Sequence, residues 1–246
     1  MNNIHKIITT TLIILATTAC SNVEEVNSSD IASSEMWARF EVFSTEDNTA
    51  TARASLLVGG SHSNTHINIT GGDKLEVFNG TNVQTVVKDP TSSKVVYVAT
   101  FDHTNSGRGN TNYRFDFSRD EHRSATNSIV SLPIAVNKDN ILFNPSSSFS
   151  RSTEAVTVTW DGIEDSEVDL QITGNCIQTY SKKIPDTGEF TINANSIKSN
   201  PNQPGGSCQL TFKFTRTNTG TVDDAFGEGG EIHAYSSREA TLLTTQ

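Results

Sequence analysis

Apolar and polar side chains alternate with a period of two along most of the chain, which is the pattern of a β-strand with one buried face. The clearest run carries the apolar residues Cys208, Leu210, Phe212 and Phe214. Residues 50–58 repeat the pattern, and no stretch keeps a helical period over three turns. The alternation therefore predicts an all-β protein.

The strand signals fall into two groups separated by a polar stretch. Residues 36–138 contain about seven such signals, with a tight-turn dipeptide at Asn79-Gly80. Residues 139–153 are polar and rich in serine, so we place a linker there. A second set of signals fills residues 154–246. We expect two tandem antiparallel β-sandwiches, with one large β-sandwich of about 200 residues as the alternative.

The N-terminal residues carry an export signal. Ile7 to Ala16 form an apolar run of about ten residues, whereas a helix needs about twenty to cross a bilayer. Such a run, followed by small residues, matches the apolar part of a signal peptide. The small residues lead into Cys20. Residues 1–19 are therefore predicted to be a signal peptide.

This N-terminal region resembles the lipobox of bacterial lipoproteins. In that family the cysteine receives a diacylglyceryl group, the signal is cut before it, and the new N-terminus is acylated. The resemblance implies that Cys20 is lipidated, and more than one acyl chain makes such anchoring durable. An ordinary secretory signal with a coincidental cysteine is the alternative, because Thr17 stands where the family usually has leucine.

The same resemblance implies a location. Ser21 follows the cysteine in place of aspartate, which favours sorting to the outer membrane of a diderm bacterium. Residues 20–35 are polar and acidic without a sustained period, so we expect an acylated N-terminus followed by a flexible tether.

The chain is acidic, with a formal net charge of −10 and an isoelectric point near 5.0. Removal of residues 1–19 takes away one lysine and shifts the charge to −11. An acidic surface argues against nucleic acid as a partner and against electrostatic docking on anionic lipid.

The chain contains three cysteines. If Cys20 carries lipid, Cys176 and Cys208 remain, and an exported protein tends to pair them. A disulfide closing a loop of this length would stabilise the fold by about 3–4 kcal/mol. With Trp160 on a strand signal, this arrangement loosely resembles an immunoglobulin-like sandwich, in which a buried tryptophan packs near a disulfide.

Carboxylates crowd the turn after Trp160. Calcium takes several oxygen ligands from a bent loop, so this turn is a candidate Ca²⁺ site, and a solvated acidic turn is the alternative. A second acidic cluster lies in the glycine-rich stretch 223–231. No other cofactor is predicted. The candidate calcium ligands are Asp161, Glu164, Asp165 and Glu167.

No catalytic residues are predicted. The chain has no Gly-x-Ser-x-Gly elbow and no His-Glu-x-x-His motif. His62 and His66 lie four residues apart in a turn-like stretch, and we interpret them as exposed loop histidines. Trp37 and Trp160 could stack on a sugar, although the strand pattern around Trp160 favours core packing.

These features favour a non-enzymatic, lipid-anchored envelope protein. We expect it to act as a binding or assembly module, with its sandwich loops contacting an envelope protein or a glycan. A hydrolase of envelope polymers, or its carbohydrate-binding accessory, is the first alternative. A purely structural spacer is the second.

Overall fold

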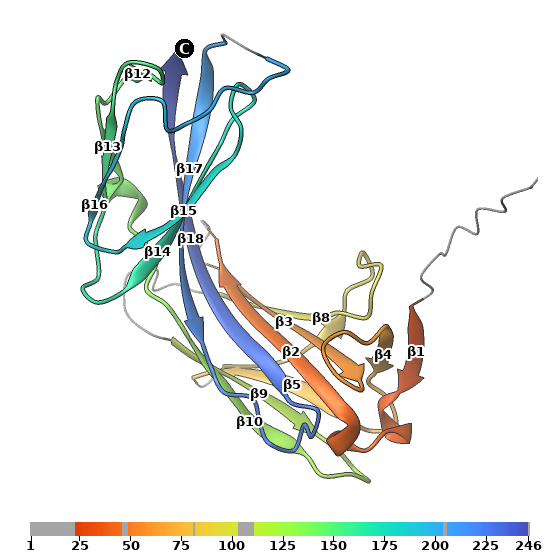
Figure 1. The fold of residues 1–246 in the computed structure, drawn as a ribbon. Coiled ribbons are helices and arrows are strands. Elements are labelled where there is room, and N and C mark those ends of the chain that lie inside the picture. Colours follow the sequence, from red (N-terminus) through yellow and green to blue (C-terminus); the bar gives the residue numbers. More distant parts are fainter. Residues whose placement is uncertain (1–22, 46–48, 81, 103–110, 204–205, 246) are drawn as a thin grey trace, which may run out of the picture.

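The computed structural model describes residues 23–45, 49–80, 82–102, 111–203 and 206–245 (Figure 1). Regular structure in these residues is β-strand apart from three short 3₁₀ helices, so the predicted all-β class is confirmed. Within the same residues no helix is long and apolar enough to cross a membrane. The elements are β1 (Glu24–Asn27), η1 (Ser28–Asp30), η2 (Ser33–Glu35), β2 (Met36–Ser44), β3 (Thr49–Val58), β4 (Thr65–Asn68), β5 (Lys74–Asn79), β6 (Asn82–Thr85), β7 (Val87–Lys88), β8 (Tyr97–Asp102), β9 (Thr111–Ser118), β10 (Ala125–Leu132), η3 (Lys138–Asn140), β11 (Leu142–Asn144), β12 (Ser148–Ser150), β13 (Val156–Thr159), β14 (Glu167–Thr173), β15 (Tyr180–Pro185), β16 (Glu189–Ile192), β17 (Cys208–Thr219) and β18 (Gly230–Thr245).

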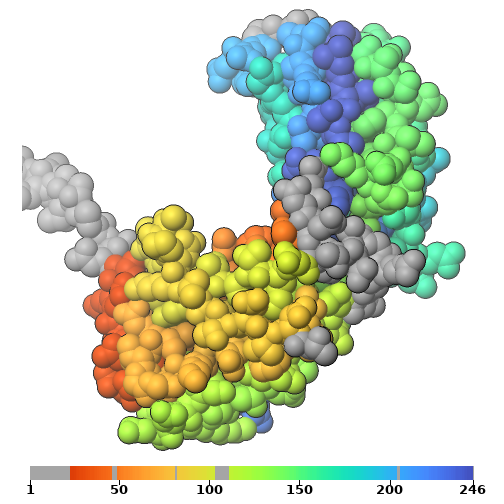
Figure 2. All heavy atoms as spheres, turned by 180° about the vertical axis from the view of Figure 1, so that it is seen from behind, coloured from red at the N-terminus to blue at the C-terminus, as the bar shows by residue number. Residues whose placement is uncertain are grey.

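One long sheet runs through the whole molecule. It has 11 strands, ordered β1-β4-β3-β2-β18-β17-β14-β15, with β7, β8 and β12 attached beside this path. A four-stranded sheet, β10-β9-β5-β6, packs on one end of it, and a three-stranded sheet, β11-β13-β16, packs on the other. The molecule is therefore two β-sandwiches that share their longer sheet, seen as two lobes in Figure 2.

The two sandwiches have separate hydrophobic cores of different composition. The first core is rich in aromatic rings, with Phe40 stacked on Phe115 at 4.5 Å between ring centroids. The second core is mostly aliphatic and contains the two cysteines, with Trp160 packed 5.2 Å from Phe214 between ring centroids. In both, buried residues alternate along the strands that the sequence pattern marked most clearly, such as β3 and the start of β17.

Strand β18 belongs to both sandwiches. Its first residues pair with β2 and bury Ile232 and Ala234 in the first core, whereas Leu242 lies in the second core. Residues 222–234 thus pack in the first sandwich, although we expected them in the second. The expected linker 139–153 also contributes Ile141 and Phe149 to the second core. The polar stretch between the two groups of strand signals marks an edge of the second sandwich.

Three strand pairs in the long sheet are parallel, in contrast to the antiparallel pairing expected. They are β18 with β2, β12 with β18, and β1 with β4. Parallel neighbours must be joined by a long crossover. The connections from β2 to β18 and from β12 to β18 pass through strands of another sheet, whereas the connection from β1 to β4 passes through β2 and β3 of the long sheet itself. Short-range patterns carry no information on such pairings.

Residues 24–35, part of the expected flexible tether, form β1, η1 and η2. Ser28 and Ser33 are 0% and 3% exposed. The Arg119 guanidinium donates to the Ser28 carbonyl and, at 2.8 Å, to the Ser33 hydroxyl, and it pairs with Asp73 at 3.0 Å. The tether prediction is therefore wrong for residues 24–35, because a buried arginine some ninety positions away holds this segment against the first sandwich.

Candidate functional site

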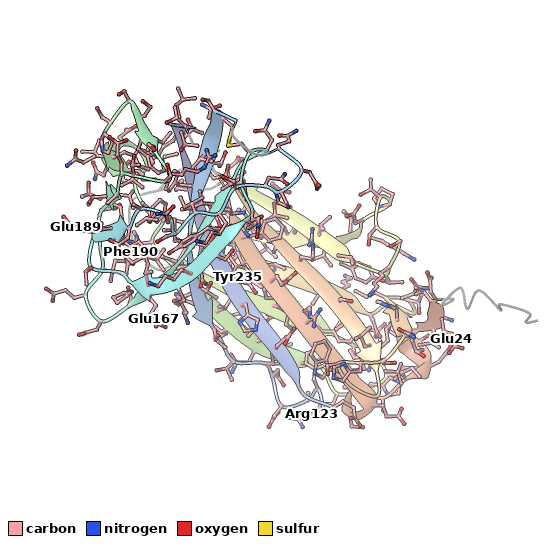
Figure 3. All side chains as sticks on the ribbon, turned by 45° about the horizontal axis from the view of Figure 1, so that its top comes forward. Glu24, Arg123, Glu167, Glu189, Phe190 and Tyr235 are labelled. Atoms are coloured by element: carbon pink, nitrogen blue, oxygen red, sulfur yellow. A yellow bond between two sulfur atoms is a disulfide. The ribbon has the colours of Figure 1, made fainter. Side chains whose placement is uncertain are left out.

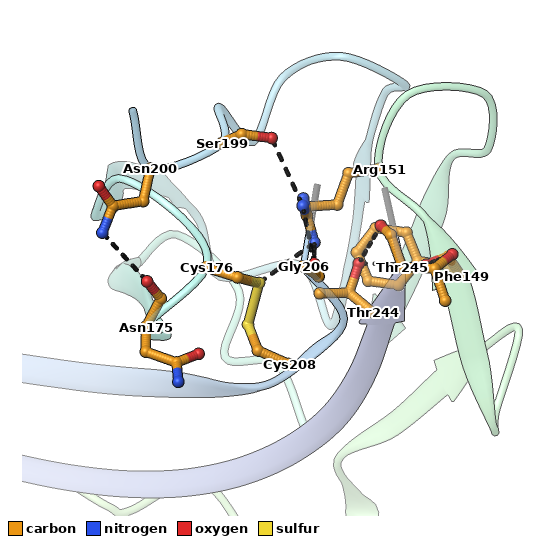
Figure 4. The surroundings of a disulfide bond; sticks show 10 residues. All are labelled: Phe149, Arg151, Asn175, Cys176, Ser199, Asn200, Gly206, Cys208, Thr244 and Thr245. Carbon is orange, nitrogen blue, oxygen red and sulfur yellow. Dashed lines mark hydrogen bonds between the residues drawn. A yellow bond between two sulfur atoms is a disulfide. The ribbon is translucent and has the colours of Figure 1, made fainter. Parts of the chain in front are cut away.

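Cys176 and Cys208 form the predicted disulfide, which closes a separation of 32 residues. It joins the loop after β14 to the first residue of β17, at the end of the second sandwich (Figure 4). Cys20, the predicted lipidation site, lies outside the described residues.

The predicted calcium ligands do not converge. In the described part of the chain, no group of three or more histidine, cysteine, aspartate or glutamate side chains could hold a metal ion. Asp161 accepts a hydrogen bond from the Asn137 backbone at 2.8 Å, and Glu167 pairs with Lys183 at 2.8 Å. Asp161 and Glu167 thus contact residues on different elements, and the turn between them shows no metal cluster among the described residues.

The second acidic cluster is also engaged in ion pairs. Asp224 pairs with Arg123 at 2.5 Å, and Glu231 pairs with Arg39 at 2.5 Å. These carboxylates fasten the glycine-rich stretch to β2 and to the region before β10.

Neither tryptophan forms an exposed platform. Trp37 and Trp160 are 7% and 6% exposed. The Trp160 indole N–H donates to the Asp186 carboxylate at 2.6 Å, and the Arg39 guanidinium lies 5.3 Å from the centroid of the Trp37 ring. Arg39 covers part of the Trp37 ring, and the Trp160 ring lies in the second core, so neither offers an open face on which a sugar could stack.

A concave site lies on the outward face of the first sandwich, over β2, β3 and β4. We call it the outer pocket. Figure 3 shows this face of the long sheet, with Tyr235 of β18 beside it. Strand register sets Trp37 opposite Leu57, and Leu57 opposite His66. The cavity has a volume of about 220 Å³ and is lined by Trp37, Arg39, Glu41, Arg53, Ser55, Leu57, Ser61, Ser63, His66, Lys94 and Val96.

The outer pocket combines an apolar floor with a cationic rim. Three cationic side chains line it against the single carboxylate of Glu41. Arg39 is already paired with a glutamate, and Arg53 lies 3.9 Å from Glu41. None of the ion pairs in the described part of the chain involves Lys94. The pocket therefore offers positive charge on a protein that is acidic overall.

His66 lies at the base of the outer pocket. It is 4% exposed, so the expectation of an exposed loop histidine is wrong for His66, whereas His62 is exposed in the preceding turn. Its Nδ1 atom is buried and has no hydrogen-bond partner among the described residues. Burial, followed by the positive charge of Lys94, lowers the pKa of His66 below its usual value of 6.5. The imidazole is therefore neutral at neutral pH.

The residues of this pocket carry no joint sequence signal. Trp37 and Arg39 come from β2, Arg53 from β3, His66 from β4 and Lys94 from the stretch before β8. Only the pairing of these strands brings them together. The one available hint was the alternation in β2 and β3, which puts arginines on the face opposite the buried side chains.

Comparisons with known proteins give a limited result. The chain matches no protein-family model and no curated protein. It is similar to the solved FN1–FN3 domains of chicken CNTN1, with 9% identity and a TM-score of 0.31 over 84% of this chain and 64% of that structure. It thus spans less than two thirds of that structure. It is also similar to a chimeric titin Z1Z2 carrying a KLER peptide from decorin, with 12% identity and a TM-score of 0.24 over 84% of this chain and 94% of that one. These TM-scores are low, and neither likeness carries an argument about function.

Proposed function

We propose that this protein is a non-enzymatic, lipid-anchored binding module of the bacterial envelope, and that it takes an acidic group of a partner protein into the outer pocket. The observation that carries the proposal is the charge of the pocket: Arg39, Arg53 and Lys94 face one carboxylate in a chain of net charge −10. A local positive patch on an acidic protein steers an anionic partner to one place and repels it elsewhere.

The size of the outer pocket supports recognition of a single group. Pockets that enclose small molecules typically hold about 300–1,000 Å³, whereas this one holds about 220 Å³. An acidic side chain with an apolar neighbour fits such a volume: the carboxylate meets the rim, and the neighbour meets Trp37 and Leu57 on the floor. Ser61 and Ser63 at the edge offer hydroxyl groups to the partner's backbone.

Among the described residues, no base and nucleophile of this pocket are hydrogen-bonded to each other, which supports a binding role. In the described part of the chain, His66 makes no hydrogen bond to a hydroxyl or a carboxylate, and the hydroxyl of Ser63 accepts from the Thr65 backbone at 3.1 Å. Neither residue is arranged as a base and nucleophile pair.

The anchor belongs to the same proposal. If Cys20 carries lipid, the chain from it to the start of β1 at Glu24 spans at most about 14 Å. Because residues 24–35 are fixed to the first sandwich, that sandwich would lie close to the membrane. Glu24 donates its backbone N–H to Asn64 at 3.2 Å, next to the strand that carries His66. The outer pocket would then face a partner near the membrane surface.

Site-specific photo-crosslinking in the native envelope tests the binding role. A photoreactive amino acid at Ser61 should give one crosslinked product with an acidic protein. The double variant Arg53→Glu/Lys94→Glu should lose that product, and Lys213→Glu on the second sandwich should keep it. A product that survives the double charge reversal, or no product from Ser61, would contradict the proposal.

Membrane fractionation tests the anchor. The Cys20→Ser variant should move from the membrane fraction to the soluble fraction. The purified variant, with the photoreactive amino acid at Ser61, should still crosslink to the same partner. Continued fractionation of the variant with membranes would remove the anchoring argument.

A further inference from the structure

A buried arginine at the end of the second sandwich has no counter-ion among the described residues. Arg151 is 3% exposed, yet none of its contacts in the described part of the chain is to a carboxylate. Two other buried arginines differ: Arg119 pairs with Asp73 at 3.0 Å, and Arg216 pairs with Asp186 at 2.6 Å. A buried charge is costly unless it is paired, so an unpaired one calls for a ligand or water.

The hydrogen-bond partners of the Arg151 guanidinium are neutral, and the contacts are long for hydrogen bonds (Figure 4). Its Nη1 atom lies 3.2 Å from Cys176 Sγ and 3.3 Å from the Gly206 carbonyl. Its Nη2 atom lies 3.4 Å from the Ser199 hydroxyl and 3.3 Å from the same carbonyl. Its Nε atom is buried and has no hydrogen-bond partner among the described residues. The guanidinium therefore has capacity for a stronger acceptor.

A cavity of about 250 Å³ lies beside this guanidinium, and none of the described residues that line it carries a carboxylate. A second cation, Lys198, faces the same space together with hydroxyl and amide groups that can donate hydrogen bonds. The lining residues are Arg151, Ser152, Asn195, Ile197, Lys198 and Ser199. A guanidinium, an ammonium and neutral donors around a small volume are the groups that recognise an oxyanion.

We infer that this cavity, the Arg151 cavity, binds an oxyanion of the phosphate or carboxylate type, either as a free ion or as a group on a larger molecule. The site is on the second sandwich and is independent of the outer pocket. Arg151 holds one side of the anion, and Lys198 supplies the second positive charge.

The Arg151 cavity is rigidly built. The Arg151 backbone N–H donates to the Thr245 carbonyl at 3.2 Å, and its carbonyl accepts from Asn195 at 2.7 Å. The disulfide fixes Cys176, whose sulfur lies against the guanidinium. Because the arginine is held in place before binding, little conformational freedom is lost when an anion enters.

Titration of the purified full chain, followed through the arginine Nε–Hε signals by NMR, tests the inference. Inorganic phosphate and acetate are added separately, with chloride at matched ionic strength as the reference. The Arg151 signal should shift and saturate with at least one oxyanion. The signals of Arg119 and Arg216 should not shift, because each of these guanidinium groups is already paired with an aspartate. No saturable shift at Arg151, or equal shifts at all three arginines, would overturn the inference.

A rim variant keeps the test independent of folding. Replacement of Arg151 also removes contacts to the disulfide, so Lys198→Ala, at the exposed rim, is the decisive variant. It should weaken oxyanion binding about two- to fivefold, as expected for one partly exposed charge. The control Lys213→Ala, on β17 outside the cavity, should bind as the wild type does. An unchanged oxyanion affinity of the Lys198→Ala variant would contradict the assignment of Lys198 to the binding site. To separate a free ion from a group on a polymer, the same shift is followed with a short phosphate-bearing oligomer.

Discussion

Each sandwich contains a buried arginine–aspartate pair, but the two pairs hold different parts of the chain. Arg119 and Asp73, with side chains 0% and 3% exposed, fasten the N-terminal segment 24–35 to the first sandwich. Arg216 and Asp186, at 4% and 0%, fasten the loop after Trp160 within the second. The first pair attaches an N-terminal segment to the first sandwich, whereas the second pair connects elements within the second sandwich.

The interactions that stabilise the two sandwiches differ as well. The second has the disulfide, and the first relies on stacked aromatic rings such as Phe40 and Phe115. Yet β18 pairs with β17 along 12 residues and contributes side chains to both cores. Two cores of different design are thus coupled through one shared strand, so a defect in either core should destabilise the other.

The largest effect is expected from Asp186→Ala. Asp186 accepts from the Arg216 guanidinium and from the Trp160 indole at 2.6 Å. Its loss leaves a buried guanidinium without a counter-ion, which costs about 3–5 kcal/mol. Urea unfolding should show this loss in free energy, while Glu167→Gln, which breaks an exposed ion pair, should change little. A loss no greater than that of the control would show that the pair is not a stability element.

Removal of the disulfide is expected to cost somewhat less. The double variant Cys176→Ser/Cys208→Ser frees a loop of 32 residues, and the chain-entropy model gives a loss of about 3–4 kcal/mol. Because β18 contributes side chains to both cores, we expect one unfolding transition for the whole molecule.

The two tryptophans provide the measurement of this coupling. Trp37 lies on β2 of the first sandwich and Trp160 in the second core. Fluorescence of Trp37→Phe and Trp160→Phe versions of the disulfide variant should give the same midpoint. Two separate midpoints would show that the sandwiches unfold independently and that the shared strand β18 does not couple them.

The Arg119→Met variant should have the next smaller effect, about 3 kcal/mol, at the low end of the range for a broken buried pair. The loss is limited because release of residues 24–35 lets water reach Asp73. Hydrogen exchange should become faster in residues 24–35 and remain slow in the second sandwich. The control Arg123→Met, which removes an exposed ion pair with Asp224, should leave exchange unchanged. Protection of residues 24–35 in the Arg119 variant would contradict this explanation of their order.

Local patterns in the sequence were sufficient for the features that depend on neighbouring residues. Alternation located β3 and β17, and Asn79-Gly80 marked the hairpin in which Asn79 pairs with Asn82. Counting cysteines was sufficient for the disulfide. These features follow from the two-residue period of strands and from turn chemistry, both of which act over a few positions.

Features that depend on distant residues could not be found in this way. The order of residues 24–35 comes from Arg119, and the shared role of β18 comes from its parallel pairing with β2. Strand β15 has a run of exposed residues including Lys182 and Lys183, so it shows no clear alternation. The outer pocket and the Arg151 cavity are each assembled from separate strands and loops, so no spacing of residues along the chain predicts them.

The smallest expected effect distinguishes the two proposed sites by their response to pH. His66 in the outer pocket has its pKa lowered by burial and then by the charge of Lys94, while a hydrogen bond to the Val95 backbone and the charge of Glu25 act in the opposite direction. A lowered pKa means that the contribution of neutral His66 to stability is fully present above its usual value of 6.5 and is lost as the pH falls through the folded value.

The free energy of unfolding of the wild type should therefore decrease on acidification below pH 6.5, and the variant His66→Gln should show a flatter dependence. Protonation also adds positive charge to the outer pocket, so an acidic peptide should bind more tightly there as the wild type is acidified, provided that the peptide stays ionised. Among the described residues, the charged groups that line the Arg151 cavity are Arg151 and Lys198, and no histidine lines it. Chloride-matched titrations with an acidic peptide for the outer pocket and acetate for the Arg151 cavity, at pH 7 and at pH 6, measure both responses. Equal pH dependence at the two sites would mean that His66 does not set the charge of the outer pocket.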